Sequence, residues 1–133
     1  MINKAVGYKE CEVEFIKTGT SDGDTVAMVD YKYVKDIEKI DMITIDSLDI
    51  RNIDFISMDV EGAAMDALSG AAQTLIKHKP DLLISIYHNS AEYLMSVPFL
   101  YDFGYDINVI YTSNFLPWQP HLELSLFCTW SRK

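Results

Sequence analysis

The chain has 133 residues, of which 49% are hydrophobic, and 20 acidic against 11 basic side chains give it a net charge of −9. This length suits a single domain with a genuine core, and the apolar and aromatic content argues against intrinsic disorder. The negative charge, without any cluster of Lys and Arg, argues against nucleic acid or an anionic membrane as a partner.

Two cysteines, Cys11 and Cys128, are too few for a disulfide scaffold and indicate reduced thiols. Residues 1–4 do not begin the apolar run of a signal peptide, and no apolar stretch approaches the ~20 residues that span a bilayer. We therefore expect a soluble, cytoplasmic protein.

The amino-terminal part contains short candidate strands. Residues 11–16 alternate apolar with acidic side chains, which is typical of a half-exposed strand. Residues 18–24 are polar and include two glycines, which predicts a loop, and residues 43–45 are β-branched. Residues 46–49 predict a turn or a short helical start. We expect antiparallel or edge strands in this part.

The middle of the chain predicts a strand, a helix and a second strand. Residues 53–58 and 82–88 are short and mostly apolar, as strands buried on both faces are. Between them apolar residues recur at intervals of three and four, which predicts one helix that ends before Pro80: Met65, Leu68, Ala72, Leu75 and Ile76. Short connections favour a right-handed βαβ unit with parallel strands.

The carboxyl-terminal part repeats this pattern less regularly. Residues 91–103 predict a helix interrupted at Pro98, and residues 107–111 predict a strand. Residues 112–121 contain two prolines and predict a loop that shapes a ligand pocket. Residues 122–130 predict a last strand, which a hairpin connection would make antiparallel.

Candidate functional residues lie where the two buried strands end. Asp59 and Glu61 are two residues apart, so in an extended backbone they point to one face, and Gly62 permits a tight turn. His88 ends the next parallel strand and should lie at the same edge of the sheet, where ligands of open α/β sheets bind. Two carboxylates and an imidazole could bind a divalent metal or act as general base.

Two of these residues could instead have purely structural roles. Glu61 could only stabilise the start of the following helix, and His88 could be a hydrogen-bonded structural residue. The sequence lacks glycine-rich phosphate loops, a Gly-x-Ser-x-Gly elbow, a Cys-x-x-Cys pair and a His-Glu-x-x-His motif. Other common catalytic signatures are therefore absent.

Several segments together resemble one family. Residues 53–63, Ile-Asp-Phe-Ile-Ser-Met-Asp-Val-Glu-Gly-Ala, with residues 67–71 and Lys79-Pro80, resemble FkbM-type methyltransferases. Residues 43–48 and 3–7 resemble further segments of that family. The resemblance covers most of the chain, and the Asp-Val-Glu-Gly block is its most specific part.

The resemblance implies an α/β fold: a partial Rossmann-like class I methyltransferase sheet, mostly parallel with an antiparallel last strand, in one domain over residues 1–133. It implies S-adenosylmethionine as cofactor and a hydroxyl of a small molecule or saccharide as methyl acceptor. Asp59 would end the fourth strand beside the methyl donor, and His88 would end the fifth. The implied catalytic residues are Asp59 and His88, the implied cofactor-binding residues are Asp59, Glu61 and Gly62, and no metal ligand is assigned.

Two kinds of departure matter. Ser57 stands where the family usually has lysine, and Ala64 where it usually has glutamate. The glycine-rich first loop has no counterpart, so the resemblance implies the carboxyl-terminal half of the domain, a truncated form with an incomplete cofactor site. The alternative is a non-catalytic α/β module that binds a partner or self-associates through an exposed sheet edge.

Overall fold

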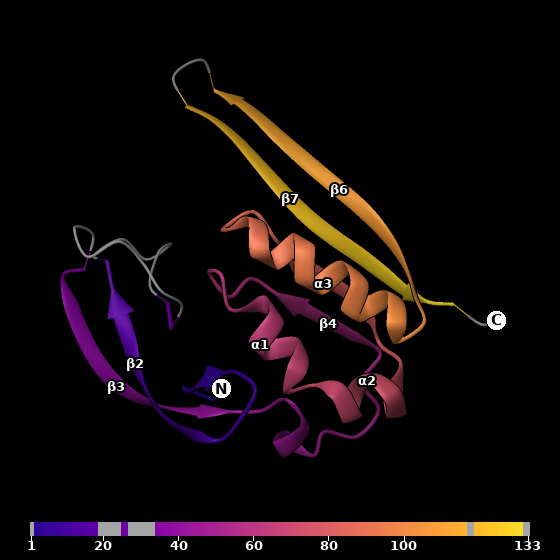
Figure 1. Cartoon of the computed structure of the whole chain (residues 1–133), viewed down its shortest axis with the longest axis horizontal. Helices are drawn as coiled ribbons and strands as arrows, with labels where there is room; N and C mark the ends of the chain where they lie inside the picture. Colours follow the sequence, from indigo (N-terminus) through magenta and orange to yellow (C-terminus); the bar gives the residue numbers. More distant parts are fainter. Residues whose placement is uncertain (1, 19–24, 27–33, 117–118, 132–133) are drawn as a thin grey trace.

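The computed structural model describes residues 2–18, 25–26, 34–116 and 119–131, without the side chains of residues 112–122. Within these residues the chain forms two sheets (Figure 1). The first has the order β1-β3-β2, with β1 Ala5–Val6, β2 Cys11–Lys17 and β3 Asp36–Ile43. The second has the order β4-β5-β7-β6, with β4 Phe55–Met58, β5 Asp81–Ser85, β6 Tyr105–Leu116 and β7 Gln119–Trp130. The helices are the 3-10 turn η2 Asp46–Leu48, α1 Ala64–Ser69, α2 Ala72–His78 and α3 Ser90–Asp102.

The first sheet confirms the short amino-terminal strands. β2 pairs antiparallel with β3, and its acidic side chains at Glu12 and Glu14 are exposed, as the alternation predicted. Lys39 on β3 forms an ion pair with Glu12 across the strands at 2.8 Å, which adds little stability because both side chains face solvent. Apart from Thr18, the loop predicted for residues 18–24 lies outside the described residues.

The second sheet contains the predicted βαβ unit. β4 pairs parallel with β5, and α1 and α2 connect them. The side chains of Leu82 and Ile84, on one face of β5, are completely buried. The prediction that both strands are buried on both faces is wrong for β4, whose Phe55 and Ser57 are exposed.

The prediction of a mostly parallel sheet is wrong. Among the described strands only the β1–β3 and β4–β5 pairs are parallel, whereas β7 pairs antiparallel with both β5 and β6. β6 ends at Leu116 and β7 begins at Gln119, and so short a connection permits only antiparallel pairing, because a parallel crossover needs a dozen residues or more. The antiparallel last strand was predicted correctly.

The loop predicted for residues 112–121 is also wrong. These residues continue β6 and β7 as a long hairpin, with Thr112 opposite Glu123 and Leu116 opposite Gln119, and residues 117–118 lie outside the described part. β7 pairs with β5 only from Ser125 to Cys128, so β6 is its one described neighbour near Pro120. A proline, which has no N–H to donate, is tolerated where one side of a strand has no partner.

Instead of one helix after β4 there are two, which meet at Gly70 and Ala71. The Gly70 carbonyl accepts a hydrogen bond from the Asp46 N–H at 2.9 Å, and a Cβ on Gly70 would lie 2.0 Å from the carbonyl oxygen of Gly7. The Asp46 carboxylate accepts hydrogen bonds from the first N–H groups of α2, at 2.7 Å from Thr74. The break between α1 and α2 therefore allows Gly7, next to β1, and η2 to pack closely against the helices.

α3 runs through Pro98 without the predicted interruption. Proline leaves the carbonyl of the residue four positions earlier without a helical partner. That residue, Leu94, is 68% exposed, so water can solvate its carbonyl. The Asn89 side chain begins the helix by accepting a hydrogen bond from the Glu92 N–H at 3.0 Å.

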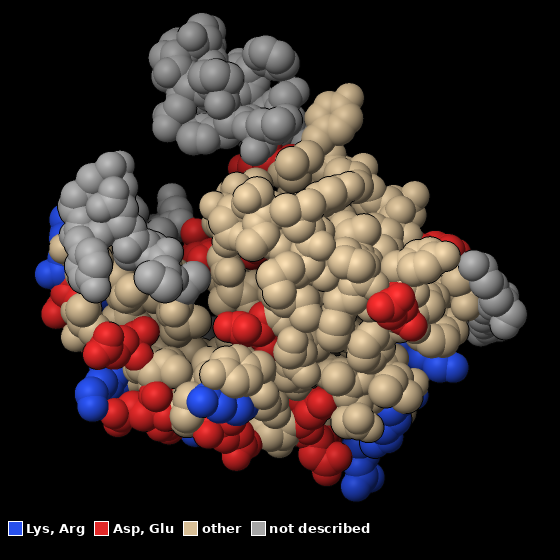
Figure 2. Space-filling view, in the orientation of Figure 1, with Lys and Arg blue, Asp and Glu red and all other residues tan. Residues whose placement is uncertain are grey.

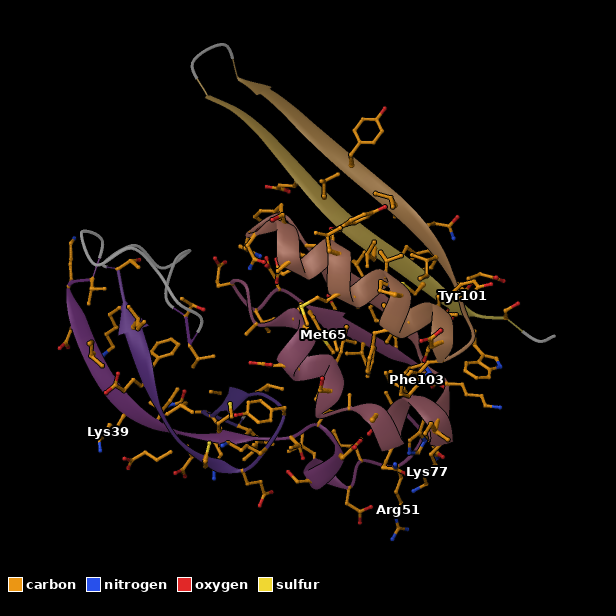
Figure 3. The ribbon with its side chains drawn as sticks, in the orientation of Figure 1. Lys39, Arg51, Met65, Lys77, Tyr101 and Phe103 are labelled. Carbon is orange, nitrogen blue, oxygen red and sulfur yellow. The ribbon has the colours of Figure 1, made fainter. Side chains whose placement is uncertain are left out.

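One apolar core joins the helices to the second sheet. α1 and α3 lie side by side in front of β4 (Figure 1). The largest completely buried side chains come from α1, α2, α3, β5 and β7: Leu68, Leu75, Leu82, Ile84, Leu100 and Leu126. Lys39, Arg51 and Lys77 lie at the outer edge of the molecule (Figure 3). No helix in the described part of the chain is long and apolar enough to cross a membrane.

Gly70→Ala should lower the free energy of unfolding by about 1–3 kcal/mol, because two backbone segments in close contact cannot move apart as flexible side chains can. The φ of Gly70 is −77°, so the loss would come from the Gly7 contact rather than from backbone strain. Urea unfolding followed by circular dichroism measures it. Ser69→Ala, an exposed neighbour, is the control, and a Gly70→Ala variant as stable as that control would contradict the close approach.

Candidate functional site

The turn after β4 places the two candidate carboxylates. β4 ends at Met58, and the backbone then enters the left-handed region at Glu61 (φ 48°) and Gly62 (φ 96°). This conformation suits glycine but costs a residue with a side chain roughly 1–2 kcal/mol. The Thr25 hydroxyl donates a hydrogen bond to the Glu61 carbonyl at 2.8 Å and helps to hold the turn. Strained non-glycine residues of this kind cluster at functional sites.

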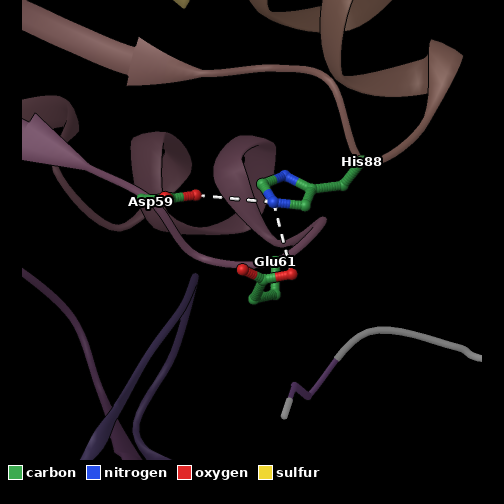
Figure 4. A group of neighbouring side chains, drawn as sticks. All are labelled: Asp59, Glu61 and His88. Carbon is green, nitrogen blue, oxygen red and sulfur yellow. Dashed lines mark ion pairs between the residues drawn. The ribbon is translucent and has the colours of Figure 1, made fainter. Parts of the chain in front are cut away.

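His88 reaches the same edge from the neighbouring strand. It lies three residues beyond β5 and two before α3. Its Nε2 is 3.4 Å from Asp59 Oδ1 and 3.3 Å from Glu61 Oε2 (Figure 4). The structure therefore brings together Asp59, Glu61 and His88, and it places Gly62 in the turn beside them, where its carbonyl lies 3.5 Å from the Asn89 amide.

The three side chains differ in their access to solvent. The His88 side chain is only 11% exposed, whereas that of Asp59 is 54% exposed and that of Glu61 25%. The imidazole is therefore enclosed, while the Asp59 carboxylate can reach a ligand that arrives from solvent. Figure 2 shows acidic side chains between the first sheet and the larger body of the helices and second sheet.

Glu92 is a site residue that the sequence reasoning missed. Its side chain is 2% exposed, and its Oε2 lies 3.3 Å from His88 Nδ1. Its Oε1 lies 3.4 Å from the Ala64 N–H at the start of α1. One feature of the sequence could have indicated this role: Glu92 lies four residues after His88, at the start of a predicted helix. A buried carboxylate is costly unless it is paired. The contact with Glu92 therefore favours an orientation of the imidazole in which Nδ1 points toward this carboxylate.

Tyr87 was also missed. Its ring centroid lies 4.1 Å from that of His88, with the planes tilted by 33°. Burial raises the pKa of the Tyr87 hydroxyl, and the negative charges of Asp59 and Glu61 raise it further. The hydroxyl therefore stays protonated at neutral pH and can donate a hydrogen bond at this edge.

A cavity of about 200 Å³ lies beside the carboxylates. Residues of the first sheet form one wall, including Ala5, Val6 and Phe15, and the turn after β4 supplies Asp59 and Glu61. Small-molecule sites usually have volumes of about 300–1,000 Å³. The cavity is therefore large enough for part of a small-molecule ligand.

Comparison with known proteins identifies the family. Residues 4–107 match the methyltransferase FkbM domain. The chain belongs to the FkbM methyltransferase family. The resemblance based on the Asp-Val-Glu-Gly block is thus confirmed. In the structure, Asp59 and Glu61 of this block follow directly after β4, which ends at Met58.

One solved structure, the methyltransferase FkbM from Methylobacillus flagellatus KT, is similar with a TM-score of 0.63 and 24% sequence identity. The similarity covers 94% of this chain and 27% of that FkbM methyltransferase, so the present chain corresponds to a minor part of its length. At this identity the likeness shows the α/β fold alone. No curated protein matches the chain.

Asp59→Asn should lower the pKa of Tyr87, because the substitution removes one of the two nearest negative charges while burial remains. An NMR titration of labelled tyrosine rings, assigned with Tyr87→Phe, measures the shift. Asp102→Asn at the far end of α3 is the matched control. An unchanged Tyr87 titration in Asp59→Asn would contradict the placement of Asp59 beside this hydroxyl.

Proposed function

We propose that the chain is part of an S-adenosylmethionine-dependent methyltransferase that acts on a hydroxyl of a small molecule or saccharide. The supporting observation is that His88 Nε2 lies 3.4 Å from Oδ1 of Asp59, the first residue of the Asp-Val-Glu-Gly block that resembles the family. β4 and β5 are parallel, and ligands of open α/β sheets bind beyond the carboxyl ends of such strands. In this proposal the second sheet is part of a Rossmann-like class I sheet.

Asp59 and His88 are the proposed catalytic residues. The bound donor supplies an electrophilic methyl group on its sulfonium. As the acceptor oxygen bonds to that carbon and the carbon–sulfur bond breaks, the hydroxyl proton passes to Asp59 or His88. The exposed Asp59 carboxylate can orient the hydroxyl, and the Tyr87 hydroxyl can donate to an acceptor oxygen. Holding the two reactants in line supplies most of the acceleration.

Asp59, Glu61 and Gly62 are the proposed contacts to the donor. Carboxylates suit its ribose hydroxyls and its positive sulfonium and ammonium groups. The cavity of about 200 Å³ accommodates only part of such a molecule. We therefore propose that the glycine-rich loop of a complete domain, which these 133 residues do not contain, completes the donor site.

Calorimetric titration with S-adenosylmethionine tests donor binding. We expect weak binding by the 133-residue chain that Asp59→Ala weakens further and Asp102→Asn leaves unchanged. No heat at millimolar ligand would contradict donor binding by this chain alone. In an assay with a labelled methyl group, Asp59→Ala should reduce transfer to an accepted hydroxyl by about 10²–10⁴-fold, the usual contribution of a general base.

A non-catalytic module is the second candidate function, and one observation favours it. β4 is the terminal strand of the second sheet among the described residues, and its Phe55 is 51% exposed. Terminal strands present unpaired N–H and C=O groups that can pair with another chain. Sedimentation equilibrium distinguishes the two, because association that rises with concentration supports a module completed by a second copy.

A further inference from the structure

We propose that Asp59, Glu61 and His88 form a divalent cation site in which Glu92 orients the histidine. The first argument is distance. One donor atom from each of the three residues lies within 4.8 Å of the others, and the contacts from His88 Nε2 are 3.3 and 3.4 Å. Adjacent ligand atoms on one ion with bonds of about 2.1 Å lie roughly 3.0–3.5 Å apart, so the two contacts from His88 Nε2 fit a common ion. The Asp59 and Glu61 oxygens, which lie within 4.8 Å of each other, must come within about 4.2 Å when both bind it.

The second argument is hydrogen bonding. Both ring nitrogens of His88 are buried, and neither has a hydrogen-bond partner in the described part of the chain. Carboxylate oxygens face both nitrogens. A neutral imidazole has one N–H and one lone pair, so it can satisfy a carboxylate at only one of its nitrogens. A second proton on the other nitrogen would let the ring donate to both sides, whereas a metal ion there would bind the lone pair together with the Asp59 and Glu61 carboxylates.

Glu92 shows which nitrogen binds the ion. Its Oε2 is buried without a hydrogen-bond partner and lies 3.3 Å from His88 Nδ1, on the side of the ring away from Asp59 and Glu61. A metal-binding histidine usually donates its second N–H to a carboxylate, which fixes the tautomer and the ring orientation. Glu92 therefore favours the proton on Nδ1 and leaves the Nε2 lone pair for the cation.

The ligand chemistry indicates the class of ion. Two carboxylates and one imidazole suit borderline first-row cations such as Mn²⁺ and Zn²⁺, whereas Mg²⁺ and Ca²⁺ prefer oxygen ligands alone. The 54% exposure of Asp59 leaves the site open on the solvent side, where water or a substrate hydroxyl can bind. Cation binding rests on this geometry, and only its use to activate a hydroxyl rests on the proposed function. With Nε2 bound to the cation, His88 has no free lone pair, so Asp59 and not His88 accepts the hydroxyl proton in that case.

Titration of the 133-residue chain with Mn²⁺ tests the site in the absence of methyl donor and acceptor. At about 150 mM salt, which screens diffuse attraction to the acidic surface, calorimetry should show one Mn²⁺ per chain. Asp59→Asn and His88→Ala should weaken the affinity roughly tenfold or more, as should Glu92→Gln, which keeps an oxygen for the Ala64 N–H. Electron spin-echo modulation should show a coordinated imidazole nitrogen that His88→Ala removes.

Asp102→Asn is the matched control for charge, and circular dichroism checks that each variant folds. The proposal is overturned if the wild-type chain binds no Mn²⁺ at millimolar concentration, or if Asp59→Asn binds as tightly as Asp102→Asn. Unchanged affinity in Glu92→Gln would remove the positioning role of Glu92. Because no donor is present, these outcomes are independent of the test of methyl transfer.

Discussion

The parallel pairing of β4 with β5 is the constraint on which the rest of the site depends. Ser57 lies opposite Leu83 and Met58 opposite Ile84, so both strands end at one edge of the sheet. This register brings residues nearly thirty positions apart in the sequence to the same edge. The crossover through α1 and α2 fixes the direction of both strands, and their apolar faces join the core.

α3 is coupled to this edge through the buried carboxylate of Glu92. Glu92 reaches the start of α1 with one carboxylate oxygen and the ring of His88 with the other. The helix thus connects the packing of the core to the orientation of the imidazole. A change in the core that displaced α3 would also turn the ring, so the stability of this region and the geometry of the site are linked.

The sequence predicted the βαβ unit and the shared edge because both follow from local patterns. Apolar runs of strand length and an apolar stripe of helical period locate the elements, and parallel pairing then places Asp59 near His88. The break at Gly70 was not predictable in this way, because it results from the approach of Gly7, far away in the sequence. The two prolines in residues 112–121 wrongly predicted a loop, since the effect of a proline depends on which strand edges have partners. Glu92 was missed because burial cannot be recognised from a single acidic residue.

The left-handed backbone of Glu61 has a consequence for protein engineering. Glycine or asparagine would fit this turn at a lower conformational cost, so a screen for thermal stability alone would favour replacing the glutamate. Such a screen would remove one of the two carboxylates that face His88 Nε2 while it improved the fold. Selection for robustness and selection for ligand binding therefore act in opposite directions at this one position.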